Sequence, residues 1–99
     1  MALFHLYKFT SARFLSSPTT ANQCRTEIED LLVYNKKIEI DFSDVFVTAG
    51  FLEQLLIPIL EQRGEALISR LFFANCSEVA DANISEIMSR YKKTSMAND

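Results

Sequence analysis

The chain has 99 residues, of which 48% are hydrophobic and 23% are charged, and its formal net charge at pH 7 is −3. This length fits one domain, and this balance of residues is typical of a folded globular protein rather than a disordered chain. The basic residues are scattered, with only Lys36-Lys37 and Lys92-Lys93 adjacent, which argues against binding to nucleic acid.

The chain contains no apolar run of the roughly 18 residues that a membrane span needs, and its start does not follow the pattern of a signal peptide. Cys24 and Cys76 lie far apart and outside any CxxC or CxxH setting, so redox and zinc motifs have no support. We therefore expect a cytoplasmic protein without membrane insertion, cofactor or metal site.

The first elements in chain order are a strand and a helix. The aromatic-rich residues 2–9 predict a half-buried strand, and residues 10–16 predict a polar connector. Ser17 as N-cap and Pro18 at the first helical position then indicate a helix, which we expect to end at Asn35 in a left-handed cap.

The middle of the chain predicts a second strand and a strongly apolar helix. Residues 38–42 alternate in the manner of a strand, while residues 45–47 either continue its line or begin a turn. Thr48 is a candidate N-cap for a helix over residues 49–62, which Pro58 should kink or split. Apolar residues surround most of this helix, so it is either deeply buried or offers a further face to a partner.

The last third predicts a strand over residues 66–74 and a helix that Asn75 caps, with Glu78 at its third position. We expect residues 94–99 to form a polar, frayed tail and residues 2–93 to be ordered within a single domain, 1–99. The order β-α-β-α-β-α predicts an α/β fold in which helices pack against one small, mostly parallel sheet.

Catalytic patterns are sparse in this sequence. His5 is the only histidine, and it falls within the expected first strand, where a structural role is the better interpretation. Asp41 and Asp44 form a close carboxylate pair, but aspartate after a strand is more often a turn former. Cys24 fits the apolar stripe of the first helix, whereas Cys76 lies near a helix start that could lower its thiol pKa. We therefore expect a protein that is not an enzyme.

The strongest functional signal is the loop from Ser43 to Gly50, which joins the end of a strand to the start of a helix. Ligands and partners of α/β folds often bind at such positions. The structural alternative is that Thr48 only caps the helix; the functional one is a docking surface that a phosphate on Thr48 or Ser43 would regulate by adding charge.

The same region carries a resemblance to a known family. Three segments are similar to STAS domains, and more closely to the STAS-like group of formerly unknown function: residues 14–21, residues 40–55 and residues 71–79. The second of these contains Ile40-Asp41-Phe42-Ser43-Asp44-Val45 and Thr48-Ala49-Gly50-Phe51-Leu52. Together the segments cover most of residues 14–88 with short, mainly structural motifs.

The resemblance implies a function as well as a fold. Anti-sigma factor antagonists, the best-known STAS proteins, bind a GHKL-type kinase through the corresponding loop and helix, and phosphorylation of a serine at the helix start breaks the complex. Asp41 and Ser43 match the family's strand-end residues, but the loop is shorter and Ala49 and Gly50 stand at the usual serine positions, which leaves Thr48 as the nearest hydroxyl. Ser17 also stands where the closer group usually has arginine.

Three functional hypotheses follow. The first is a non-enzymatic interaction module of a signalling or partner-switching system, which docks a kinase or ATPase through residues 43–56. The second is a structural subunit of a transporter-ATPase assembly. The third, an enzyme that uses Asp41 or Cys76, lacks a visible second catalytic group. A homodimer built through the apolar helix is compatible with each. The predicted partner-binding residues are Asp41, Ser43, Asp44, Thr48, Ala49, Gly50 and Phe51, with Thr48 and Ser43 as candidate phosphoacceptors.

Overall fold

The computed structural model describes residues 1–96 and has an α/β architecture. The elements in chain order are β1 (Ala2–His5), α1 (Leu6–Thr10), β2 (Phe14–Leu15), α2 (Pro18–Tyr34), β3 (Ile38–Asp41), β4 (Phe46–Val47), α3 (Ala49–Arg63), the 3-10 helix η1 (Glu65–Arg70), β5 (Leu71–Ala74) and α4 (Glu78–Met96). Residues 94–96, expected in a frayed tail, belong to α4, and residues 97–99 lie outside the described residues.

The main sheet has three strands in the order β1-β3-β5, and both pairs are parallel. Phe4, Ile40 and Phe73 stand in register across it. A second, two-stranded parallel sheet joins β2 to β4, so the segments around residues 14 and 46 pair with each other rather than extend the main sheet. The predicted α/β fold with a small, mostly parallel sheet is confirmed.

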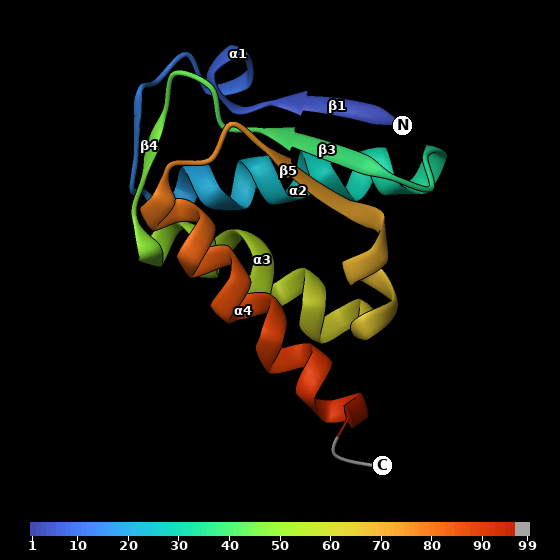
Figure 1. Cartoon of the computed structure of the whole chain (residues 1–99). Helices are drawn as coiled ribbons and strands as arrows, with labels where there is room; N and C mark the ends of the chain where they lie inside the picture. Colours follow the sequence, from blue (N-terminus) through green and yellow to red (C-terminus); the bar gives the residue numbers. More distant parts are fainter. Residues whose placement is uncertain (97–99) are drawn as a thin grey trace.

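The molecule has two layers, because α2, α3 and α4 all lie on the same side of the main sheet (Figure 1). Side chains alternate along a strand, so the row of Phe4, Ile40 and Phe73 faces the helices and contributes to the core. In the neighbouring row, Leu3 and Phe72 are exposed on the opposite face.

Helix α3 forms the centre of the helical layer, between α2 and α4. Six of its side chains are fully buried: Phe51, Leu52, Leu55, Leu56, Ile59 and Leu60. This result decides between the two alternatives for the apolar helix in favour of burial. Pro58 does not split the helix, which continues to Arg63 as one element.

The first predicted strand is too long, because β1 ends at His5 and a short helix follows. His5 caps α1, since its Nδ1 accepts a hydrogen bond from the backbone N–H of Lys8 at 3.4 Å. Ser11 ends the helix in a left-handed conformation, with its N–H bonded to the carbonyl of Tyr7. The apolar residues of the predicted strand are therefore divided between the strand β1 and the short helix α1.

The third predicted strand is also too long, because residues 65–70 form η1 before β5 begins. Arg70 fixes this turn against the end of α2, donating to the carbonyls of Leu32, Asn35 and Lys36 at 2.8, 2.9 and 2.7 Å. Leu67 of η1 is buried in the core. These long-range contacts override the strand preference of the local sequence.

Two predicted helix caps are corrected. Asn35 ends α2 in an extended conformation (φ −133°) rather than a left-handed one. The first turn of α4 is capped by Ser77, whose Oγ accepts from the N–H of Ala80 at 3.1 Å. Asn75 instead takes a left-handed conformation (φ 58°) just before that turn, and its side chain bonds to Asp41 and Ser43.

Candidate functional site

Four polar residues meet at the carboxyl edge of the main sheet, one from the end of each strand and one from the loop after β3. Asp41 is their centre, because its Oδ1 accepts from Ser43 N–H at 2.9 Å, from Ser43 Oγ at 2.6 Å and from Asn75 Nδ2 at 2.9 Å. Asn75 Nδ2 also donates to Ser43 Oγ at 2.9 Å. His5 Nε2 lies 3.8 Å from the other carboxylate oxygen, Asp41 Oδ2.

These contacts set the charge of the cluster. Partial burial on its own would raise the pKa of Asp41, but the hydrogen bonds from Asn75 and Ser43, with His5 nearby, outweigh burial and lower that pKa from 3.8 to about 2. Asp41 is therefore a carboxylate at neutral pH, and this negative charge orients the three donors around it.

The cluster ties strand ends together rather than assembling a nucleophile. The Ser43 hydroxyl donates to Asp41 and not to His5, and a carboxylate with a pKa of about 2 is too weak a base to activate a serine efficiently near neutral pH. Burial, together with the charges of Asp81 and Asp41, raises the pKa of the Cys76 thiol, so the expectation of a lowered value was wrong. In the described part of the chain no group of His, Cys, Asp and Glu side chains is arranged to hold a metal ion.

The loop after β3 turns sharply and then pairs with the N-terminal part of the chain. The N–H of Val45 bonds to the carbonyl of Phe42, and Asp44 takes a left-handed conformation (φ 65°) with its side chain exposed. The N–H groups of Phe46 and Thr48 then bond to the carbonyls of Arg13 and Leu15 at 2.6 and 3.1 Å. The loop is thus held in place at both ends.

Thr48 caps the start of α3, as predicted. Thr48 Oγ1 accepts from the N–H of Phe51 at 3.1 Å, and Ala49 and Gly50 are exposed in the first turn. Phe51 is 0% exposed, so its predicted role in partner binding is corrected: a partner at the surface cannot contact this side chain. Its place in the core follows from the helix period, which turns residues 51, 55 and 59 inward.

An exposed aromatic pair accompanies this loop and was not predicted as part of the site. Phe14 of β2 and Phe46 of β4 are direct partners in the small parallel sheet, and they are 65% and 71% exposed. Their neighbours in the same pair, Leu15 and Val47, turn toward the core. Each phenylalanine lies in a short apolar run, Phe14-Leu15 or Val45-Phe46-Val47, but only the pairing of β2 with β4 makes the two residues neighbours.

Comparison of the chain with protein-family models, with curated proteins and with solved structures found no match. None of the helices in the described part combines the length and the apolar character that crossing a membrane requires.

Proposed function

We propose that the protein is a non-enzymatic interaction module of a cytoplasmic signalling system, which docks a kinase or ATPase partner. Its docking surface consists of the loop residues Asp44, Thr48, Ala49 and Gly50 together with Phe14 and Phe46, and is called the loop surface below. The similarity of the strand-loop-helix sequence to STAS domains suggests a GHKL-type ATPase as the partner.

The exposed pair of Phe14 and Phe46 is the observation that carries the proposal. Aromatic residues are enriched at the energetic centres of protein interfaces, because they bury large areas with few rotatable bonds. The two residues are neighbours in one strand pair and both are more than half exposed, so they form an apolar patch of the kind that marks interaction sites. They flank a loop whose backbone is fixed by hydrogen bonds at both ends, so docking requires little ordering.

The surroundings of the two candidate phosphoacceptors favour Thr48 over Ser43. A phosphate on Ser43 would bring negative charge against the Asp41 carboxylate, which lies 2.6 Å from Ser43 Oγ. A phosphate on Thr48 would instead stand at the amino end of α3, where the helix dipole stabilises negative charge. Regulation by phosphorylation is therefore proposed at Thr48.

The alternative is a structural subunit of a transporter-ATPase assembly, which uses the same loop surface for permanent contact. The exposed rings fit this function as well, because permanent interfaces are the more hydrophobic class. The two functions differ in the identity of the partner and in whether Thr48 is ever modified.

The test is affinity capture of the tagged protein from its native cells, with mass spectrometry of both the captured proteins and the bait. The loop variant carries Phe14→Ser and Phe46→Ser. A matched control carries Val33→Ser and Tyr34→Ser, which removes two exposed apolar side chains at the other end of α2. Capture of a GHKL-type ATPase by the wild type and the control, but not by the loop variant, supports the proposal.

The modification state of the bait separates the two functions. Phosphate on Thr48 in the fraction without partner supports partner switching. Capture of transporter subunits by an unmodified bait favours the structural subunit. If the loop variant and the control capture the same proteins as the wild type, the loop surface is not a docking site.

A further inference from the structure

The outer edge of β5 has unpaired backbone groups. In the described part of the chain β5 pairs with β3 alone, and the carbonyl of Ala74 accepts from the N–H of Phe42. Alternate residues of a parallel strand face the same neighbour, so Phe72 and Ala74 turn their backbone groups toward β3. Phe73 therefore turns its N–H and carbonyl outward, where a further strand could pair with them.

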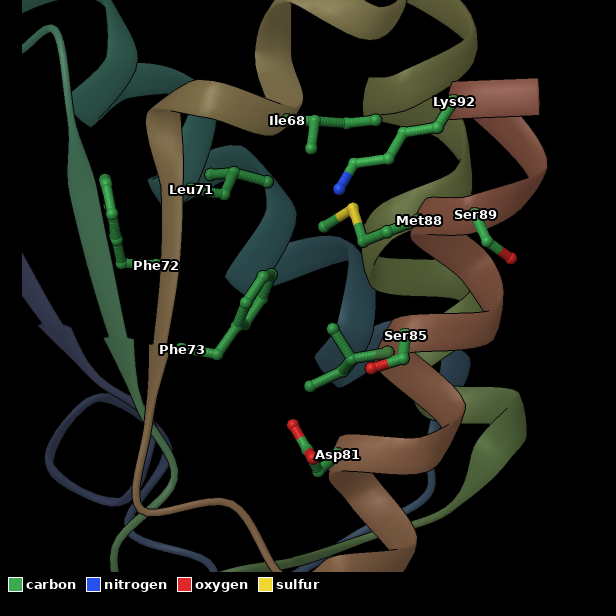
Figure 2. A pocket seen from close by; sticks show the side chains of 10 residues that line it. Ile68, Leu71, Phe72, Phe73, Asp81, Ser85, Met88, Ser89 and Lys92 are labelled. Carbon is green, nitrogen blue, oxygen red and sulfur yellow. The ribbon is translucent and has the colours of Figure 1, made fainter. Parts of the chain in front are cut away.

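A groove runs beside this edge, between β5 and α4, and has a volume of about 420 Å³. Figure 2 shows that Phe73 of β5 and Met88 of α4 point into it from opposite sides, with Ile68 of η1 near one end. Ile84 lines it as well. The groove thus has apolar walls next to an unpaired strand edge.

The two ends of the groove carry opposite charges. Asp81 stands at the end near the close of β5, and Lys92 stands at the other end, beside Ile68 (Figure 2). Between them α4 presents Ser85 and Ser89, whose small side chains leave room for close approach. Because α4 runs antiparallel to β5, the acidic end lies near the carboxyl end of the strand and the basic end near its start.

This arrangement is self-complementary. In an antiparallel pair of two β5 strands around a two-fold axis, the start of one strand lies opposite the end of the other. The Lys92 end of each groove then faces the Asp81 end of its partner, so both charge pairs are attractive. We propose that a second copy of this chain docks here, joining two sheets of three strands into one continuous sheet through β5.

The symmetry of the charges favours a second copy over an unrelated peptide. An unrelated strand would have to carry a basic and an acidic group at the matching spacing, whereas another copy supplies both from the same helix. This dimer leaves the loop surface free, because Phe14 and Phe46 belong to the separate β2-β4 sheet. Whether this dimer forms is therefore independent of whether an ATPase docks at the loop surface.

The first test is sedimentation equilibrium of the full chain with charge variants. Asp81→Lys alone and Lys92→Asp alone each turn both attractive pairs into repulsive ones and should raise the dimer Kd by about tenfold. The double variant, with the two charges exchanged, should restore the Kd to within about threefold of the wild type. A mixture of the two single variants should form heterodimers more tightly than either forms homodimers.

Matched controls are Asp30→Lys and Lys36→Asp, which make the same charge changes at exposed positions outside the groove. These variants should dimerise as the wild type does. A wild-type chain that stays monomeric up to about 1 mM overturns the proposal, as does a Kd that responds equally to groove and control variants.

Amide hydrogen exchange by NMR tests the strand pairing itself. The N–H of Phe73 should exchange at least about tenfold more slowly as the protein is concentrated into the dimer, while that of Phe72, already turned toward β3, should not change. A dimer whose Phe73 amide exchanges as fast as in the monomer would use another surface and would refute pairing through β5.

Discussion

Asn75 donates its side-chain N–H to Asp41 Oδ1 at 2.9 Å and so joins the loop after β5 to the end of β3, 34 residues earlier in the chain. The left-handed backbone of Asn75 (φ 58°) aims this side chain back across the sheet edge. Asparagine adopts that conformation more readily than most residues. One amide thus fixes the loop from which α4 starts relative to the loop that leads into α3.

Replacing Asp41 with Asn should destabilise the fold at neutral pH. The pKa of Asp41 is about 2 in the folded chain and 3.8 ordinarily, so its charge contributes about 2 kcal/mol above pH 4. A lowered pKa means that this contribution is lost as pH falls through about 2. Urea unfolding of the wild type and Asp41→Asn should therefore differ most at pH 7 and converge near pH 2.

The control for this experiment is Asp44→Asn, three residues further along the same loop. Asp44 is exposed, and asparagine tolerates its left-handed conformation, so the free energy of unfolding should change by less than about 0.5 kcal/mol. A difference between wild type and Asp41→Asn that stays constant from pH 7 to about 2 would show that the charge of Asp41 is not what stabilises the loop.

Arg70 should matter more for stability than its partly exposed position suggests. Its guanidinium donates to three carbonyls at or just after the end of α2, those of Leu32, Asn35 and Lys36. Arg70→Ala should lower the free energy of unfolding by about 2 kcal/mol, and Arg70→Lys should recover only part of this, because an ammonium lacks the planar fork. Thermal and urea unfolding measure both, with the exposed Lys36→Ala as the control, expected to be nearly neutral.

The helices were more predictable from the sequence than the strands. Ser17-Pro18 and Thr48 are local signals, and the structure uses both as the start of a helix. The buried face of α4 also follows from its 3.6-residue period. Each of these features depends on residues within a few turns, so the sequence holds the necessary information.

The strand boundaries and the site depended on contacts between distant segments. The local sequence of residues 66–70 predicts a strand, but these residues form a 3-10 turn that the hydrogen bonds of Arg70 hold against the end of α2. Asp41 and Ser43 were predicted to belong to the site, whereas the role of Asn75 was not, because nothing local aims its side chain at β3. Phe14 and Phe46 likewise become a pair only when β2 meets β4.

The two glycines of the chain should respond to alanine in opposite directions. Gly64 ends α3 with φ 74° and ψ −164°, a region that is essentially closed to other residues, so Gly64→Ala should destabilise the fold by about 1–3 kcal/mol. Gly50 lies in the first turn of α3 with open space around it, so Gly50→Ala should stabilise by about 0.5 kcal/mol. Parallel urea titrations measure both; equal effects would mean that the backbone at Gly64 is not constrained as described.

Substitutions at Thr48 separate its structural role from its regulatory one. Because Thr48 Oγ1 caps α3 through the N–H of Phe51, Thr48→Ala should cost about 1 kcal/mol of unfolding free energy. Thr48→Ser and Thr48→Asp both keep a capping oxygen, and aspartate adds a charge that the amino end of a helix tolerates, so each should unfold within about 0.5 kcal/mol of the wild type.

The same variants then test regulation, because Thr48→Ser and Thr48→Asp are matched in stability and differ in charge. A docking surface that is switched by phosphate at Thr48 should keep its captured partner with serine and lose it with aspartate. Affinity capture with Thr48→Ala, Thr48→Ser and Thr48→Asp as the three baits measures this directly. Equal capture by the serine and aspartate baits would instead indicate a permanent contact, in which Thr48 acts as a helix cap and the two exposed phenylalanines beside it supply the binding energy.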